Sequence, residues 1–228
     1  MLGRNPRPRQ VSVVVIGLGR FGGAVAASLA RRGIDVVGVD IQPGVVQRWA
    51  QQIEHVVQAD ATDDEALARL GVSEFDRAVV AIGNDVEASV LSAVALVEAG
   101  VHEVWAKAIT RKHGRILGKI GVQHVIYPDW SMGERVAHIV AGGMTDYMGF
   151  EDGFAIARTR APHETWDRTL AQSQPRTLHG VTIVGLKRPG EDFTYAQADT
   201  VVQRGDELIV SGPTDRVEAF SRLADLPE

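Results

Sequence analysis

A glycine-rich segment near the N-terminus has the residue types and the spacing that bind phosphate groups. Gly17, Gly19 and Gly22 lie in the segment GLGRFGG, directly after the β-branched run 11–16. In such a segment the first glycine permits a tight turn, the second lets backbone approach a phosphate, and the third lets helix and strand pack closely. The helix that follows presents free N–H groups and its positive dipole end to the anion. The segment therefore predicts nucleotide binding, with a glycine turn kept only for packing as the alternative.

An acidic residue at the end of the next strand supports the same interpretation. The pattern predicts a helix over 24–32 and a strand over 34–39 that closes on Asp40. Asp40 lies about 20 residues beyond the glycines, where a carboxylate accepts hydrogen bonds from ribose hydroxyls. Its negative charge would repel a 2′-phosphate, so NADP is disfavoured.

Composition narrows the class of protein. The chain has 228 residues, no cysteine, 45% hydrophobic residues and a net charge of -5. Disulfides and thiolate chemistry are therefore excluded, and nucleic acid is not expected as a partner. No apolar run approaches the roughly 20 residues that span a bilayer, and residues 1–10 lack the apolar core of a secretory signal. We expect a cytoplasmic protein that begins with a disordered arm over 1–10.

The first 141 residues alternate strands with helices, which predicts a doubly wound, parallel, Rossmann-like α/β sheet. A helix over 129–140 then leads away from the sheet, and the remainder predicts a smaller α+β lobe with a helix over 166–171. We expect a nucleotide-binding domain with this crossover helix over 11–141, and a C-terminal domain over 150–226. The further expected strands are 55–58, 75–82, 103–109, 122–127, 154–160, 181–187, 200–202 and 207–211, and the further helices are 43–52, 63–70, 85–99, 111–120 and 214–223.

Polar residues and a glycine follow later strands of the predicted sheet. Asp60 and Thr62 come directly after strand 55–58, and ligands of open α/β sheets bind at that carboxyl edge. Alternatively, Thr62 caps the next helix, with Glu65 completing a capping box. Gly83, after strand 75–82, permits close approach of backbone to a ligand.

The ordered motifs GLGRFGG, VVGVD, QADATDDEAL, VVAIGN, VWAKA and YPDWSMG resemble the cytosolic regulatory subunits of Ktr- and Trk-type potassium uptake systems, which are RCK-domain proteins. The resemblance covers nearly the whole chain, with a looser match at PRTLHGVTIVGLKRPG and GDELIVSG. It implies a non-catalytic sensor of ATP or ADP, with NAD(H) bound by some relatives. It also implies homodimers that assemble into an octameric ring, which docks on a membrane K+-translocating subunit at the inner face of the cell membrane.

The resemblance also assigns site residues. Arg20 lies inside the glycine turn, where a guanidinium suits a terminal phosphate; the alternative is a surface arginine that pairs with a helix acid. From its own position near the C-terminal end of strand 103–109, and not from the resemblance, Lys107 is expected to reach a phosphate or a neighbouring carboxylate. The full predicted nucleotide site is Gly17, Gly19, Arg20, Phe21, Gly22, Asp40, Ile41, Asp60, Ala61, Thr62, Ala81, Ile82, Gly83, Asn84 and Lys107.

Two further residues match functional positions of relatives. Asp129 aligns with a family glutamate that helps hold a cation, and a carboxylate is a suitable ligand for Mg²⁺, Ca²⁺ or Na⁺; alternatively it is the N-cap of helix 129–140. Arg176 matches an arginine that binds cyclic di-AMP in several relatives; alternatively it is a solvated loop residue.

Two other functions remain open from the residues alone. One is an NAD-dependent oxidoreductase, which requires an acid/base residue in the cleft, and the motifs offer no candidate. The other is a free-standing NAD(H) or nucleotide sensor that acts on a different partner. We therefore expect no enzymatic activity.

Overall fold

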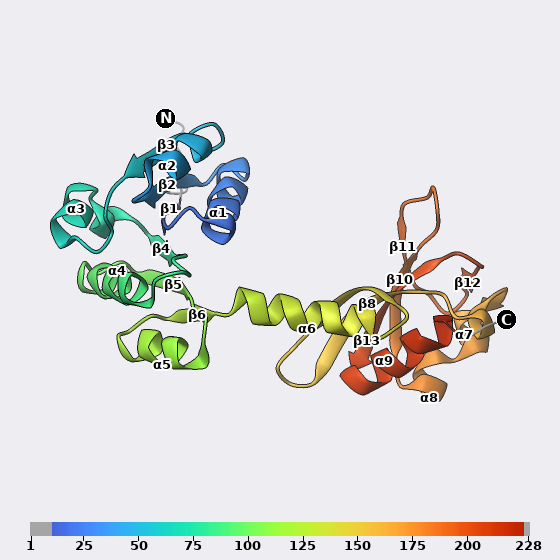
Figure 1. The fold of residues 1–228 in the computed structure, drawn as a ribbon. Coiled ribbons are helices and arrows are strands. Elements are labelled where there is room, and N and C mark those ends of the chain that lie inside the picture. The colour runs from blue at the N-terminus through green and yellow to red at the C-terminus, as the bar shows by residue number, and fades with distance from the viewer. Residues whose placement is uncertain (1–10, 226–228) are drawn as a thin grey trace, which may run out of the picture. The chain divides into compact units, whose positions relative to one another are not determined.

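The computed structural model describes residues 11–225, and the chain divides into two units, residues 1–129 and 130–228 (Figure 1). The division lies within one helix, α6 (Pro128–Val140), after its second residue. It therefore falls earlier than the boundary expected at 142–150. Each unit is described by itself.

The first unit is built on six parallel strands in the order β3-β2-β1-β4-β5-β6. The predicted doubly wound sheet is confirmed. The order reverses between β1 and β4, which pair with each other although β2, β3 and the helices α1, α2 and α3 lie between them in sequence. The strands are β1 (Ser12–Ile16), β2 (Asp35–Asp40), β3 (His55–Gln58), β4 (Arg77–Val80), β5 (Glu103–Lys107) and β6 (His124–Ile126).

Helices cover both faces of this sheet because its central strands are apolar on both sides. In β1, Val13 and Val15 pack with Ala26 of α1, whereas Val14 and Ile16 belong to the cluster that contains Leu96 of α4. A run of β-branched residues is the expected sequence of a strand buried on both faces. The helices are α1 (Arg20–Arg31), α2 (Pro43–Trp49), α3 (Asp64–Arg69), η1 (Val72–Glu74), α4 (Val86–Glu98) and α5 (Arg111–Lys119).

The second unit is a five-stranded antiparallel sheet in the order β11-β10-β13-β8-β7, with α9 packed against it. Val217 and Phe220 of α9 are fully buried in its core. A separate pair, β9 and β12, lies outside this sheet. The elements are β7 (Met144–Gly149), β8 (Phe154–Arg160), η2 (His163–Thr165), β9 (Arg168–Thr169), α7 (Leu170–Ser173), α8 (Pro175–His179), β10 (Thr182–Lys187), β11 (Phe193–Tyr195), β12 (Val201–Val202), β13 (Glu207–Pro213), α9 (Thr214–Arg222) and η3 (Leu223–Asp225).

The helix predicted over 166–171 is wrong. Asp167 has a positive φ angle of 53°, which interrupts a continuous helix through this segment, and Gln174, with a φ of 46°, ends the short helix that follows. Residues 168–169 instead form β9, and α7 begins at Leu170 behind a capping box made by Thr169 and Gln172. The strand β7, which the sequence pattern does not predict, extends the sheet before β8.

Contacts of α6 explain why most of this helix groups with the second unit. Arg135 forms an ion pair with Asp146 at 2.5 Å. The Nδ1 atom of His138 lies 2.7 Å from Oε1 of Glu218, and its ring stacks on Tyr147 at a centroid distance of 4.0 Å. Hydrogen bonds from Arg135, opposed by partial burial and aided by the Tyr147 amide, hold the pKa of Asp146 below its usual value.

Over residues 11–225, none of the helices has the length and apolarity that a membrane crossing needs.

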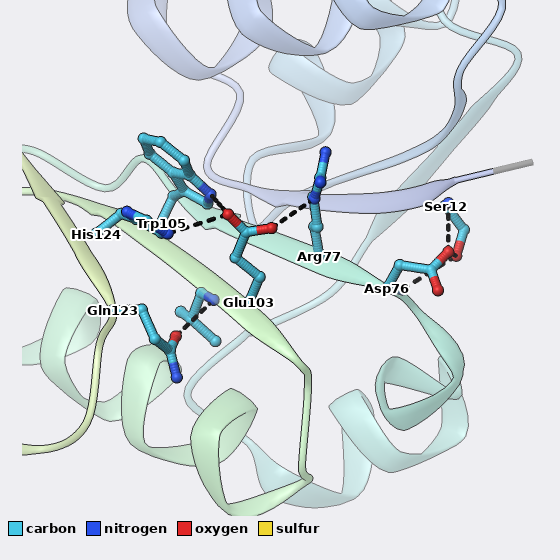
Figure 2. Close-up of polar contacts among 8 residues, drawn as sticks. Ser12, Asp76, Arg77, Glu103, Trp105, Gln123 and His124 are labelled. Atoms are coloured by element: carbon cyan, nitrogen blue, oxygen red, sulfur yellow. Dashed lines mark hydrogen bonds and ion pairs between the residues drawn. The ribbon is translucent and has the colours of Figure 1, made fainter.

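The amino edge of the parallel sheet is closed by a polar network (Figure 2). Oε2 of Glu103 accepts a hydrogen bond from Nε of Arg77 at 2.6 Å, and Oε1 accepts one from the Trp105 indole at 3.2 Å. The His124 ring stacks on the Trp105 ring, with the two ring centroids 3.9 Å apart. Partial burial raises the pKa of Glu103, but the hydrogen bond and the charge of Arg77 lower it by more. The pKa of Glu103 therefore lies below its usual value. These groups are bound to one another at the edge opposite Gly17.

Truncating the core of the second unit tests its packing. We expect Phe220→Ala to lower the free energy of unfolding by about 3–5 kcal/mol, because it opens a cavity at a fully buried site. Chemical denaturation followed by circular dichroism measures this change. The control is Leu178→Ala, since Leu178 is 65% exposed and its change should stay within about 0.5 kcal/mol. Equal effects of the two substitutions would contradict the packing described.

Candidate functional site

A cavity of about 680 Å³ lies at the carboxyl edge of the parallel sheet, where the strand order reverses. This is the position at which open α/β sheets bind ligands, and the volume lies in the range of small-molecule sites. All of its lining residues belong to the first unit. They are Ile16, Gly17, Gly19, Arg20, Phe21, Val39, Asp40, Ile41, Gln42, Val45, Ala59, Asp60, Ala61, Thr62, Ala81, Ile82, Gly83, Asn84, Asp85, Ala88, Ser92, Lys107, Ile109 and Asp129.

The cavity brings together every residue predicted for the nucleotide site except Gly22. Gly22 lies behind the wall, where a Cβ atom would come within 1.9 Å of the Gly17 carbonyl oxygen and 2.7 Å of the Ala81 Cβ. Its role is therefore the close packing of helix and strand. The remaining lining residues could not be singled out from the sequence, because they belong to no recognised motif. Most are apolar or small, whereas Gln42 and Asp85 are the N-caps of α2 and α4. These residues are Ile16, Val39, Gln42, Val45, Ala59, Asp85, Ala88, Ser92 and Ile109.

The glycine turn is fixed by backbone bonds to the strands on both sides of β1. The Gly17 amide donates to the Val39 carbonyl at 2.8 Å, and the Ala81 amide donates to the Ile16 carbonyl at 2.7 Å. Gly17 has a φ of 85°, which side chains rarely permit. Helix α1 begins at Arg20, four residues before the predicted start, so its N-terminus opens at the cavity. The N–H groups of its first turn can donate hydrogen bonds to an anion there, and the positive end of its dipole attracts one.

Asp40 lies at the end of β2 with both carboxylate oxygens engaged by backbone. Oδ2 accepts from the Leu18 amide at 2.7 Å, and Oδ1 accepts from the Gln42 amide at 2.9 Å. Each carboxylate oxygen retains a further lone pair. The side chain is therefore held in one orientation at the cavity wall and can still accept from hydroxyl groups of a ligand.

The segment after β3 differs from the capping box predicted for Thr62. The N-cap of α3 is Asp63, whose side chain accepts from the Glu65 amide at 2.9 Å. Thr62 instead donates its hydroxyl at 2.7 Å and its amide at 2.9 Å to Asp60. These two hydrogen bonds, the hydroxyl first, lower the pKa of Asp60 against a small opposing effect of burial. Asp60 is therefore a fixed carboxylate at the cavity wall.

Lys107 supplies a positive charge inside the cavity. Its Nζ atom lies 2.9 Å from Oδ2 of Asp129 and 5.7 Å from the centroid of the Phe21 ring. The lysine side chain is 14% exposed, and it passes beside Gly83, where a Cβ atom would lie 3.5 Å from Nζ. Asp129 is in the first turn of α6, which begins at Pro128, so the predicted N-cap role for Asp129 is wrong. Arg20 is exposed at the start of α1.

A second, shallower groove of about 360 Å³ lies in the second unit around Arg176. Arg176 is an exposed residue of α8, so the alternative of a loop residue is wrong. Its Nε donates to the Thr182 hydroxyl at 3.3 Å. The groove is lined by Leu170, Ala171, Gln174, Pro175, Arg176, Thr177, Val181, Thr182, Ile183, Ala196, Gln197 and Ala198.

The first unit thus defines a Rossmann-like nucleotide-binding class of protein, joined in sequence to a small antiparallel lobe. The chain matches the TrkA-N domain over residues 13–128 and the TrkA-C domain over residues 163–225. It belongs to the TrkA-domain family that includes the Ktr and Trk potassium uptake proteins.

Individual relatives match over most of the chain. The Ktr system potassium uptake protein C of Bacillus subtilis (strain 168) is 35% identical, over 91% of this chain and 95% of the relative. The Ktr system potassium uptake protein A of Vibrio alginolyticus is also 35% identical, over 89% of this chain and 93% of that relative. Among solved structures, the GsuK RCK domain aligns with a TM-score of 0.52 and 23% identity, over 96% of this chain and 47% of that chain. A GsuK channel bound to NAD aligns with a TM-score of 0.51 and 23% identity, over 97% of this chain and 40% of that chain.

The Asp60–Thr62 contact generates a prediction about ionisation. We expect Thr62→Val to raise the pKa of Asp60 toward its ordinary value, because the larger of the two hydrogen bonds is lost. Carboxyl-selective NMR titration measures this pKa. Thr110→Val serves as a control, since Thr110 caps α5 and does not contact Asp60. An unchanged pKa of Asp60 in Thr62→Val would show that the hydroxyl does not stabilise the carboxylate.

Proposed function

We propose that this protein is a nucleotide-sensing regulatory subunit of a membrane potassium transporter or channel, and that ADP and ATP occupy the cavity at the glycine turn. The observation that carries the proposal is the juxtaposition of Gly17, Gly19 and the α1 N-terminus with the Asp40 carboxylate in one cavity. Family membership supports the potassium-uptake context. The protein holds the nucleotide and performs no chemistry on it.

In this proposal the acidic and the basic residues of the cavity bind different parts of the nucleotide. Asp40 accepts from the ribose hydroxyls, which places the phosphates over the N-terminus of α1. Arg20 and Lys107 provide the cations that suit the terminal phosphates. An unphosphorylated ribose also occurs in NAD(H), so NAD(H) competes for the same cavity, whereas the charge of Asp40 disfavours NADP.

The ion pair between Lys107 and Asp129 provides a route from the ligand to the rest of the chain. A phosphate near Lys107 competes with Asp129 for the ammonium group. Asp129, once released, is free to bind a divalent or monovalent cation as a hard oxygen ligand. Because Asp129 is in the first turn of α6, the occupant of the cavity changes how the start of that helix is held.

Exposed apolar residues on α6 support the proposed assembly. Trp130, Met132, Val136 and Val140 are between 49% and 78% exposed. Burying such a helix face against a second copy is favourable. We propose homodimers that assemble into an octameric ring on the cytoplasmic side of a membrane K+-translocating subunit.

The groove around Arg176 is proposed to bind cyclic di-AMP. Its support is the arginine at the edge of an apolar groove, because a guanidinium pairs with phosphate and apolar side chains pack on a base. The pairing of Arg176 with the Thr182 hydroxyl holds the guanidinium beside the groove.

The main proposal is tested by a thermal-shift panel on the full chain with ATP, ADP, NADH and NADPH. We expect ATP and ADP to raise the melting temperature, since ligand at 100 times its Kd stabilises the native state by about 2.7 kcal/mol. NADPH should give the smallest shift because of Asp40. The absence of any shift with ATP and ADP, or turnover of NADH with a small substrate, would overturn the proposal.

The cyclic di-AMP proposal has its own test by titration calorimetry. We expect Arg176→Ala to weaken cyclic di-AMP binding by about tenfold or more, since it removes a charge-assisted contact to phosphate. Arg168→Ala, a change at another exposed arginine of the second unit, should leave the affinity unchanged. Cyclic di-AMP that fails to bind the wild-type chain, or binds both variants equally, would refute this role.

A further inference from the structure

The peptide groups that flank Leu18 are held on both sides by side chains from later elements. The Leu18 amide donates to Oδ2 of Asp40 at 2.7 Å. The Leu18 carbonyl oxygen accepts from the indole Nε1 of Trp49, the last residue of α2, also at 2.7 Å. Both distances are typical of good hydrogen bonds. The turn between Gly17 and Gly19 is therefore clamped by two residues that are 22 and 31 positions away along the chain.

Two glycines outside the phosphate-binding spacing make room for this clamp. At Gly23, a Cβ atom would lie 2.0 Å from Cζ2 of the Trp49 indole. At Gly38, a Cβ atom would lie 2.9 Å from Cδ1 of Leu18, whose side chain is 1% exposed. A side chain at Gly23 would displace the indole. Gly23 is thus explained by Trp49 and not by a ligand.

The bond to Trp49 fixes the orientation of the next amide. The Leu18–Gly19 peptide is trans, so its C=O and N–H groups point in opposite directions. With the carbonyl held by Trp49, the Gly19 N–H points away from the indole. Gly19 lines the cavity and Trp49 does not.

We infer that Trp49 is a positioning residue for phosphate binding: it holds the Leu18 carbonyl and thereby presets the Gly19 amide toward the phosphates of a nucleoside diphosphate or triphosphate. The inference rests on the proposed function, because it specifies how the same cavity is organised. Preset donors bind a ligand more tightly than donors that must be ordered on binding. Without the indole N–H, the Leu18 carbonyl is free to rotate, and the Gly19 amide rotates with it.

The matched pair Trp49→Phe and Trp105→Phe tests this inference. Both substitutions remove one indole hydrogen bond from the first unit, but Trp105 donates to Glu103 at the amino edge of the sheet (Figure 2). We expect Trp49→Phe to weaken ADP binding by about tenfold in titration calorimetry, and Trp105→Phe to leave it unchanged. We also expect the Leu18 amide of ligand-free Trp49→Phe to exchange hydrogen faster than in the wild type, because a looser turn weakens its bond to Asp40.

An unchanged ADP affinity in Trp49→Phe would overturn the inference. So would a loss of affinity without faster exchange at Leu18, because the effect would not pass through this turn. If Trp49→Phe does not fold, Trp49→Met replaces it, since a flexible side chain fills the space without a donor. A wild-type chain that binds no ADP would refute the proposed function, and the exchange measurement would still decide whether Trp49 orders the turn.

Discussion

The parallel pairing of β1 between β2 and β4 is the constraint on which the first unit depends. Because β1 is buried on both faces, its carboxyl end is fixed against the ends of two neighbouring strands. Backbone bonds from Gly17 to Val39 and from Ala81 to Ile16 carry this pairing one residue beyond the strands. The cavity is the space that remains above these ends, so its position follows from strand order and not from any single side chain.

The electrostatics of the cavity follow from the same arrangement. Carboxylates at the ends of β2 and β3 are fixed by backbone and hydroxyl donors, whereas the cation comes from the end of β5. The carboxylates of Asp40 and Asp60 therefore lie on one side of the reversal point, whereas Lys107 and its partner Asp129 lie on the other. A ligand with a polar sugar and an anionic tail matches this division. The pairing of Lys107 with Asp129 shows that the cation already has a partner that an anionic ligand would have to displace.

Much of the first unit could be predicted from its sequence because the signals there are local. The run 11–16, the glycine spacing and Asp40 lie within 30 residues and specify strand, turn, helix and strand. The contact between Gly23 and Trp49 could not be predicted, since it depends on how α2 packs on α1. Gly23 alone reads as one more glycine of the turn.

The less predictable parts have identifiable physical causes. The segment 166–171 contains residue types that suit a helix, but Asp167 has a positive φ angle and its amide donates to the Val202 carbonyl of β12, a contact distant in sequence. Helix α3 begins at Asp64, so Asp63 and not Thr62 is its N-cap, and the Thr62 hydroxyl bonds to Asp60 instead. In the same way, the grouping of α6 with the second unit depends on long-range contacts such as His138 with Glu218.

The central claim is that the glycine turn and Asp40 together hold an adenine nucleotide. A crystal structure of the full chain with bound ADP tests it most directly. The account predicts ribose hydroxyls within hydrogen-bond distance of the Asp40 carboxylate and the diphosphate at the N-terminus of α1, beside the Gly19 amide. ADP bound elsewhere on the chain, or bound in this cavity with its ribose away from Asp40, would contradict the account.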